Sequence, residues 1–530
     1  MSRILKLASV PFLCLGLACT SDDTGTSSDS DTASSTAPTT MSMSDSDTTA
    51  TGTATSTATG TASGSESDSM SGTESDSDGT STTATTAPTS TGPGTSTTDG
   101  TSTTMGLTTT GTSTTGTSTT GDPVVCGDGV VEGGEECDDG NTENNDECDW
   151  DCTLPCMPGD GGMMGDAEKS FLWVANTSQG SISKVDTQTV KELARYRSGP
   201  NGGSESPSRT AVSIDGRFVV VNNRNTGRVT MIAANEDDCN GMGGATSQNP
   251  NDLLAWQTDY CMIWSTVLPV KGSGGPGPRG VTWTPGIWNA DPNVCAFENP
   301  KIWVGYLPNQ ASTAHMARLN AVDGTIEETV SIGSWTQGWA NYGPYGAALD
   351  KLANVWFTGL RGEVFRINTS EDPITFDRWN PPGNLQFYGM TVDPDGEPWF
   401  GGCSGPVSTF NPETQEFTTI AGTQACHRGL AADQVGNVWV ASNGPCGLVQ
   451  IDHETNTLIK FHTPPQCGTP VGVSVDIEGF IWLVDQSGWA WKIDPENPDS
   501  QNWQKLTITG NHYTYSDMTG GQGKSVTLPQ

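Results

Sequence analysis

Short stretches of alternating hydrophobic and polar residues follow one another from residue 169 to residue 522. Gly, Pro, Asn and Asp bound these stretches, and none of them shows the 3.6-residue period of an amphipathic helix. Alternation with a period of two, interrupted by turn residues about every ten positions, predicts β-strands. We therefore expect this part of the chain to be all-β.

One combination of residues returns at a nearly fixed distance. A Gly-x-x-x-Asp run is followed by a strand that carries Trp, a glycine turn, and a strand that ends in Asp or Asn. The clearest copies carry Trp356, Trp399, Trp439 and Trp482, which are 43, 40 and 43 residues apart. Four short strands in about 42 residues are typical of one β-propeller blade. We expect the Gly-x-x-x-Asp run to be the inner strand of each blade.

Weaker copies bring the expected number of blades to seven, with six as the alternative because the copy around Val219–Asn222 is weak. The first copy, at Trp173, lacks an inner strand, whereas Tyr513–Gly520 has the layout of one. We predict that this C-terminal strand completes the first blade, because closure removes an open sheet edge. Two insertions, roughly 236–261 and 286–300, interrupt the period, and residues 523–530 form a tail.

The N-terminus has the pattern of an export signal. Arg3 and Lys6 precede an apolar run at residues 7–18, which is too short to span a bilayer. The segment before Cys19 resembles the lipobox of bacterial lipoproteins. The resemblance implies removal of residues 1–18 and lipidation of Cys19, so that the lipid anchors the protein to a membrane. Thr20 favours the outer membrane or cell surface; plain secretion is the alternative.

Residues 19–121 consist almost entirely of Ser, Thr, Gly, Ala and Asp. A low-complexity segment without apolar surface cannot offset the entropy of ordering its backbone, so we predict a disordered stalk. A coil of ~100 residues spans about 50–60 Å, which would hold a domain away from a membrane. The segment is a passive linker or, alternatively, an O-glycosylated stalk.

A small cysteine-rich module is expected at residues 122–157, followed by a glycine-rich linker at 158–168. Its sequence resembles the cysteine-rich repeat of myxobacterial surface proteins. The resemblance implies two disulfides among four cysteines, namely Cys126, Cys137, Cys148 and Cys152. Oxygen-bearing residues crowd the same module, and they suit Ca²⁺, although such acidic loops are more often simply solvated. The candidate ligands are Asp138, Asp139, Asn141 and Asp146.

The positions of the other cysteines predict further disulfides. Cys403 and Cys446 follow Trp strands, whereas Cys426 and Cys467 precede the next inner strands. These two kinds of loop share one face of a propeller, which predicts the pairs Cys403–Cys426 and Cys446–Cys467. Cys239 and Cys261 bracket the first insertion and are expected to pair, and elimination leaves Cys156–Cys295.

The units beginning at Pro344 and Pro470, with Trp356 and Trp482, resemble the blades of streptogramin B lyases and their NHL-type relatives. The resemblance implies the fold. In that family a His and Glu residues form the metal and base site. Here the His positions hold Tyr345, Tyr388, Arg428 and Val471, and the Glu positions hold Gly359, Gly402, Ser442 and Asp485. We therefore expect no lyase activity and no catalytic residue.

The residue before each inner strand should face the central channel. These positions include Arg209, Arg279, Tyr345, Tyr388 and Arg428. Arginine suits planar anions and tyrosine supplies flat contact area with a polar tip. We predict a binding funnel for a carboxylated, glycan-like or protein ligand; alternatively, local aspartates pair the arginines. The five histidines share no metal-ligand spacing and are expected at the surface.

Charge and composition narrow the class of function. The chain has 530 residues, a formal net charge of −37 and 33% hydrophobic residues, and it lacks the basic surface that nucleic acid requires. We expect a non-catalytic binding or adhesion module that is displayed on the cell envelope. The alternatives are a streptogramin-lyase-like enzyme with a rebuilt active site and a structural surface protein. No cofactor is expected apart from the candidate Ca²⁺.

Overall fold

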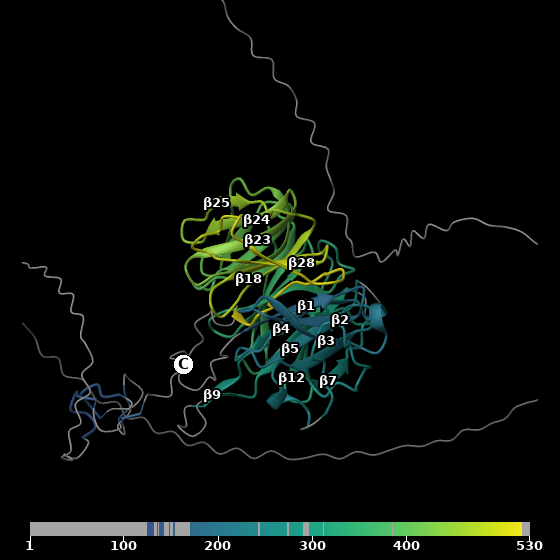
Figure 1. Cartoon of the computed structure of the whole chain (residues 1–530). Coiled ribbons are helices and arrows are strands. Elements are labelled where there is room, and N and C mark those ends of the chain that lie inside the picture. Colours follow the sequence, from purple (N-terminus) through teal and green to yellow (C-terminus); the bar gives the residue numbers. More distant parts are fainter. Residues whose placement is uncertain are drawn as a thin grey trace, which may run out of the picture. The chain divides into compact units, whose positions relative to one another are not determined.

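The structure is a computed structural model (Figure 1). It describes residues 125–131, 135, 137–142, 148, 152–153, 170–241, 244–272, 275–289, 296–310, 312–383 and 385–521. The expected signal segment, Cys19, the stalk, the glycine-rich linker and the tail at 523–530 lie outside the described residues. No helix within the described ranges is long and apolar enough to cross a membrane.

The described strands form antiparallel sheets, so the all-β prediction is confirmed. The first four sheet units contain β1 (Phe171–Asn176), β2 (Ser181–Asp186) and β3 (Lys191–Arg197); β4 (Pro207–Val212), β5 (Phe218–Asn223), β6 (Arg228–Ala233) and β7 (Met262–Val267); β8 (Val281–Thr284), β11 (Lys301–Tyr306), β12 (Thr313–Asn320) and β13 (Ile326–Gly333); and β14 (Pro344–Leu349), β15 (Val355–Gly359), β16 (Val364–Asn368) and β17 (Thr375–Trp379).

The remaining units contain β18 (Phe387–Val392), β19 (Pro398–Gly405), β20 (Ser408–Asn411) and β21 (Glu416–Thr419); β22 (Ala425–Ala432), β23 (Asn437–Gly444), β24 (Cys446–Asp452) and β25 (Thr457–His462); and β26 (Pro470–Val475), β27 (Ile481–Asp485), β28 (Trp489–Ile493) and β29 (Gln504–Thr507). Pairing of β19 with β22 joins two of these units into one eight-stranded sheet. We call each unit a blade.

Insertions lie where the repeat spacing is interrupted. Residues 234–261 separate β6 from β7 and include the short 3₁₀ helix η2 (Glu236–Asp238). The hairpin of β9 (Ile287–Asn289) and β10 (Ala296–Glu298) separates β8 from β11. A second 3₁₀ helix, η1 (Gly202–Glu205), precedes β4.

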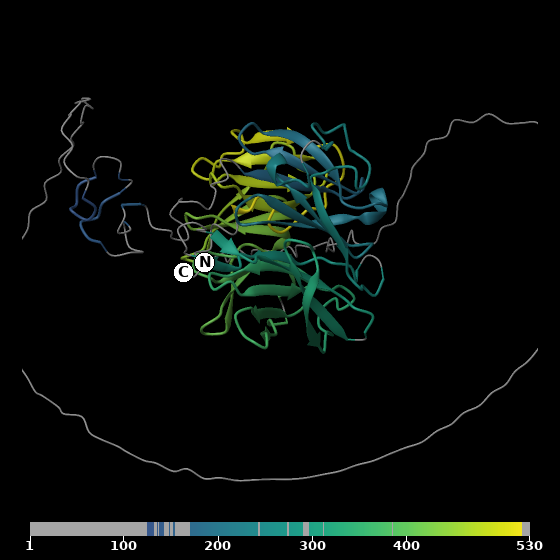
Figure 2. The ribbon, with the colours of Figure 1, turned by 90° about the horizontal axis from the view of Figure 1, so that it is seen from below.

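The C-terminal segment lies along the open edge of the first blade. Trp173 N donates to Met518 O at 2.8 Å, and Thr177 N donates to Asn511 O at 2.9 Å. The segment also reaches the second blade, where Arg209 and Tyr515 form a parallel bridge. Figure 2 shows the first, blue strands beside the last, yellow ones. The closing segment is therefore present and ties the end of the described chain to its beginning, but it pairs through isolated bridges and is not the regular strand that was expected.

A recurrent hydrogen bond explains why Asp and Trp return together. In four blades the aspartate that ends the inner strand accepts a hydrogen bond from the indole Nε1 of the Trp six residues later, at 2.7–2.9 Å. The other carboxylate oxygen accepts backbone N–H groups of the intervening turn, as Asp433 Oδ1 does from Asn437 at 2.8 Å. One side chain thus holds the turn and orients the buried indole, whose ring packs between neighbouring blades.

The propeller contains two of the expected disulfides, Cys239–Cys261 and Cys446–Cys467. The expected bond between Cys403 and Cys426 is wrong, because Cys403 is a buried free thiol. The two residues do face each other across β19 and β22, but Cys426 is disulfide-bonded to a different residue. Cys403 Sγ instead accepts a hydrogen bond from Arg361 Nη2 at 3.3 Å. Cys156 and Cys295 lie outside the described residues.

The cysteine-rich module contains the disulfides Cys126–Cys152 and Cys137–Cys148. Asp138 organises its loop by accepting backbone hydrogen bonds from four residues, Gly127, Asp128, Gly129 and Gly140, at 2.7–3.2 Å. Although desolvation opposes it, this set of N–H donors lowers the pKa of Asp138. Its oxygens are thus engaged with donors. Asp146 lies outside the described residues, and calcium binding stays a prediction.

Candidate ligand-binding site

Side chains from five blades meet where their inner strands begin. Arg209 is on β4, Arg279 lies just before β8, Tyr345 is on β14, Tyr388 is on β18 and Arg428 is on β22. Their side chains are long enough to contact one another from different blades. The five residues predicted from the sequence therefore lie close together, and two tyrosines of the closing segment join them. We call these seven residues the Arg–Tyr cluster: Arg209, Arg279, Arg428, Tyr345, Tyr388, Tyr513 and Tyr515.

Each arginine of the cluster lies over the face of a tyrosine ring. The distance from the guanidinium carbon to the ring centre is 4.1 Å for Arg209 over Tyr515 and 4.7 Å for Arg209 over Tyr345. Arg279 lies 5.1 Å from Tyr345, and Arg428 lies 4.3 Å from Tyr388. These are cation–π distances, and such contacts are strongest where water is excluded.

The phenol groups form one hydrogen-bonded network. Tyr345 Oη donates to Tyr388 Oη at 2.9 Å and lies 3.0 Å from Tyr513 Oη. Tyr388 Oη also contacts the hydroxyls of Tyr513 and Tyr515. Burial raises the pKa of Tyr515 well above its usual value, and the neighbouring phenols act in the same direction. Tyr515 therefore stays neutral and can donate a proton to an acceptor.

Arg209 is buried without a counter-charge. Its relative exposure is 1%, and no ion pair within the described residues involves it. Its Nε and Nη2 have no hydrogen-bond partner. Burying a charged group without hydrogen bonds lowers the stability of the fold unless a group of opposite charge compensates it. No aspartate among the described residues pairs with Arg209, so the alternative expectation is not met for this arginine.

Arg428 keeps its charge in the same surroundings. With the Asn443 amide oxygen turned toward it, that oxygen accepts hydrogen bonds from Nε and Nη2 at 2.8 and 3.1 Å. Burial lowers the pKa of Arg428, but the surrounding tyrosines outweigh burial, so that its pKa is raised well above the usual value. The cluster therefore combines fixed positive charge with neutral hydroxyl groups.

Several residues of this region were not predicted from the sequence. Tyr513 and Tyr515 could have been found, because a closing inner strand must also present residues to the channel. Arg224, in the turn after β5, lies 4.4 Å from the ring centre of Tyr513, and Tyr342 lies 5.1 Å from Arg279. No repeat position marks these two residues, so only the tertiary structure places them here.

The expectation that the histidines lie at the surface is wrong for three of the five. His427, His462 and His512 are buried. Burial lowers the pKa of His427 to about 4, although backbone hydrogen bonds oppose the change, and its Nδ1 lies 3.2 Å from Gly402 O. The blades pack tightly enough to enclose an imidazole that makes a backbone hydrogen bond.

The positions that correspond to the lyase Glu residues have structural contacts. Asp485 is buried and accepts backbone hydrogen bonds from Gly468, Thr469 and Ser487 at 2.8–3.0 Å. Ser442 Oγ donates to Pro445 O at 2.6 Å. Both side chains therefore stabilise loops through hydrogen bonds to the backbone.

No protein-family model and no curated protein sequence matches the chain. Several solved structures resemble it at low identity. Virginiamycin B lyase from Staphylococcus aureus, crystallised with quinupristin, is 13% identical, with a TM-score of 0.41 over 64% of this chain and 89% of that chain. AztD from Citrobacter koseri is 12% identical, with a TM-score of 0.40 over 65% and 97%. A protein from Lactobacillus plantarum is 15% identical, with a TM-score of 0.45 over 65% and 98%.

Proposed function

We propose that this chain is an exported, lipid-anchored β-propeller that binds a carboxylate-bearing ligand at the Arg–Tyr cluster and does not transform it. The observation that carries the proposal is Arg209, which is buried at 1% exposure with Nε and Nη2 lacking partners. A carboxylate would accept hydrogen bonds from both nitrogens, because a guanidinium presents its donors as a planar fork. Oxidised sugars and other glycan-like acids carry this group.

The other members of the cluster suit the same ligand. Arg428 adds a second fixed charge, and Tyr515 supplies a neutral hydroxyl that can donate to an oxygen. The tyrosine rings offer flat apolar area beside the charges, as sugar rings and planar acids require. Nothing in this arrangement provides a base next to a nucleophile, which supports binding rather than catalysis.

Titration of the full-length mature protein with matched probes tests the proposal. Galacturonate and galactose differ by the carboxylate, and citrate and N-acetylneuraminate extend the panel. We expect saturable calorimetric binding of at least one acid, no binding of galactose, and recovery of the acid unchanged. Arg209→Met should weaken binding at least about tenfold, since a charge-assisted hydrogen bond contributes about 1.5–3 kcal/mol.

Arg318→Met is the matched control, because Arg318 lies on β12 and pairs with Glu328 at 3.2 Å outside the cluster. Equal binding by the parent and by the Arg209→Met variant would contradict the proposal. So would binding of galactose as tight as that of galacturonate. Conversion of the acid to a product would favour the enzyme alternative.

The envelope part of the proposal rests on the N-terminal sequence and has its own test. Four disulfides join pairs of described cysteines, and Cys426 is also disulfide-bonded, which supports an oxidising compartment. Radiolabelled palmitate should be incorporated into the parent and not into a Cys19→Ala variant, and the label should fractionate with outer membranes. Release of an unlabelled parent into the medium would instead indicate plain secretion.

A further inference from the structure

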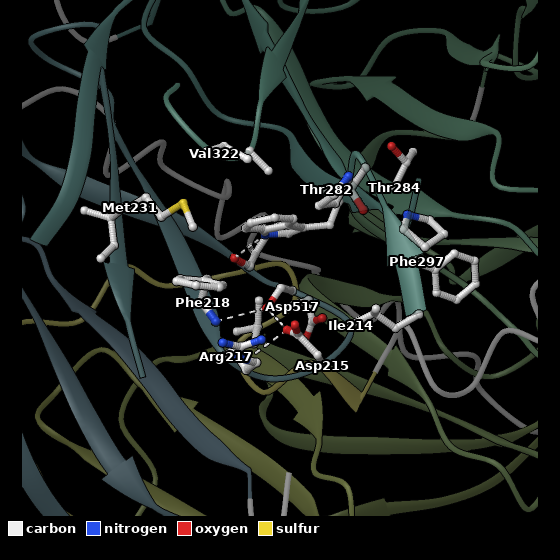
Figure 3. A pocket seen from close by; sticks show the side chains of 18 of the residues that line it. Ile214, Asp215, Arg217, Phe218, Met231, Thr282, Thr284, Phe297, Val322 and Asp517 are labelled. Carbon is white, nitrogen blue, oxygen red and sulfur yellow. Dashed lines mark hydrogen bonds between the residues drawn. The ribbon is translucent and has the colours of Figure 1, made fainter. Parts of the chain in front are cut away.

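A cavity lies where the inner strands end, and no residue of the Arg–Tyr cluster lines it. Its volume is about 650 Å³, which is sufficient for a small organic molecule. The second, third and fourth blades and the closing segment contribute to its wall. Figure 3 shows Phe218, Met231 and Val322 around the cavity.

The wall is mostly apolar and its charges are mainly negative. Apolar side chains from three blades line it, including Phe218, Met231 and Trp283. The charged lining residues are three aspartates, Asp215, Asp238 and Asp517, and one arginine, Arg217. Figure 3 shows Asp215, Arg217 and Asp517 gathered on one side of the cavity.

Arg217, the arginine among these lining residues, forms an ion pair with Asp238. Arg217 Nε donates to both carboxylate oxygens of Asp238, at 3.0 and 3.2 Å, and Nη2 also contacts Oδ1. This bidentate pair is electrically neutral. Asp215 interacts electrostatically with Arg217, but no ion pair within the described residues reaches Asp215 or Asp517. The lining therefore carries a net charge of two minus when all three aspartates are ionised.

Asp517 is held in place and keeps one oxygen available. Its Oδ1 accepts backbone hydrogen bonds from Thr519 at 3.0 Å and Gly520 at 2.8 Å, while no hydrogen bond from a described residue reaches Oδ2. Thr210 Oγ1 donates to Asp517 O at 3.1 Å, which fixes the residue against the second blade. A rigid carboxylate beside apolar walls can orient a cationic group, since protein around it keeps the local dielectric low.

We infer that this cavity binds an organic cation with an apolar body, its ammonium group near Asp517 and Asp215 and its ring or alkyl part against Phe218, Met231 and Trp283. This site is independent of the proposed carboxylate site. It needs no metal and no chemical step, only burial of apolar surface together with charge complementarity. Val322, which is 77% exposed, lines the cavity and extends its apolar surface toward the solvent.

Three probes with the same indole body test the charge requirement. Tryptamine is cationic, tryptophol is neutral and indole-3-propionate is anionic. We expect calorimetry on the full-length protein at pH 7.5 to show one-to-one binding of tryptamine, at least about fivefold weaker binding of tryptophol and no binding of indole-3-propionate. Asp517→Asn and Asp215→Asn should each weaken tryptamine binding about three- to tenfold.

Two further variants keep the test decisive. Val322→Lys places a positive charge at an exposed lining position, and it should weaken tryptamine binding while the fold is retained. Glu416→Gln, an exposed change on β21, should leave binding unchanged. Equal affinities for tryptamine and tryptophol, or unchanged tryptamine binding in both aspartate variants, would overturn the inference.

Discussion

Arg209 places its guanidinium carbon 4.1 Å from the ring centre of Tyr515, a residue more than 300 positions later in the chain. The contact exists because the closing segment lies next to β4, where the two residues form a parallel bridge. It joins the expected ligand site to the closure of the ring. Substituting either residue should therefore affect both ligand binding and the stability of the fold, and the two effects can be measured separately.

Replacing Arg209 with methionine should maintain or raise stability. The side chain is buried, and two of its nitrogens lack partners, so methionine removes an uncompensated charge while filling similar space. We expect the free energy of unfolding to change by between zero and about +4 kcal/mol. Urea denaturation measures it. A loss of more than about 2 kcal/mol would show that the cation–π contacts outweigh the cost of burial.

The hydrogen bond between Asp433 and Trp439, at 2.8 Å, should have a measurable effect on stability. Trp439→Phe removes one of the two donors to Asp433 Oδ2 and leaves only Asn437 Nδ2, at 2.9 Å. Trp303→Phe is the matched control, because Trp303 is equally buried but its Nε1 has no hydrogen-bond partner. We expect Trp439→Phe to destabilise the protein by about 1–3 kcal/mol more than Trp303→Phe does. Equal losses would mean that ring packing alone explains the recurrent tryptophan.

Asp517 should make stability fall as the pH rises. Burial raises the pKa of Asp517 to about 6, above the ordinary value of 3.8, although its hydrogen bonds oppose the shift. The folded protein therefore binds the proton more tightly, and this contribution is present below pH 4 and lost as the pH passes 6. It amounts to at most about 3 kcal/mol. Asp517→Asn should remove this part of the pH dependence in denaturation at pH 4–7.

His427 should act in the opposite direction over a similar range. Burial lowers its pKa to about 4, so the unfolded chain binds the proton more tightly. Its contribution to stability is complete above about pH 6.5 and is lost as the pH falls to 4, by up to about 3 kcal/mol. His427→Gln should make stability less sensitive to acid. An unchanged profile would show that His427 is not neutral and enclosed in the folded state.

The free thiol of Cys403 should be protected in the folded protein. The residue is 1% exposed, and alkylation requires an accessible thiolate. Iodoacetamide without reductant should modify Cys403 only after denaturation, as measured by peptide mass spectrometry. Cys446 and Cys467 should stay unmodified in both states, because their disulfide survives unfolding. Modification of native Cys403 would contradict the burial seen here.

Several features of the fold could be predicted because they repeat. The Asp and Trp positions recur with the blade, and each pair makes the same hydrogen bond, as Asp350 does with Trp356. The closing segment could be predicted because the first copy lacks an inner strand, although the segment pairs through isolated bridges and not as a strand. The pairs Cys239–Cys261 and Cys446–Cys467 followed from loop positions. Cys403 could not be assigned in this way, because facing Cys426 across two strands does not decide which bond forms.

Local periodicity was sufficient to predict the repeat, its strands and the inner-strand positions that hold Arg209, Tyr345 and Arg428, because equivalent positions of a repeat take equivalent places in the fold. The burial of Arg209 between two tyrosine rings, one of them from the closing segment, became evident from the tertiary structure. It alone brought Asp517 to the wall of a cavity with Asp215. Burial and the distance between groups far apart in the chain arise from the packing of blades around a ring, and no local pattern encodes them.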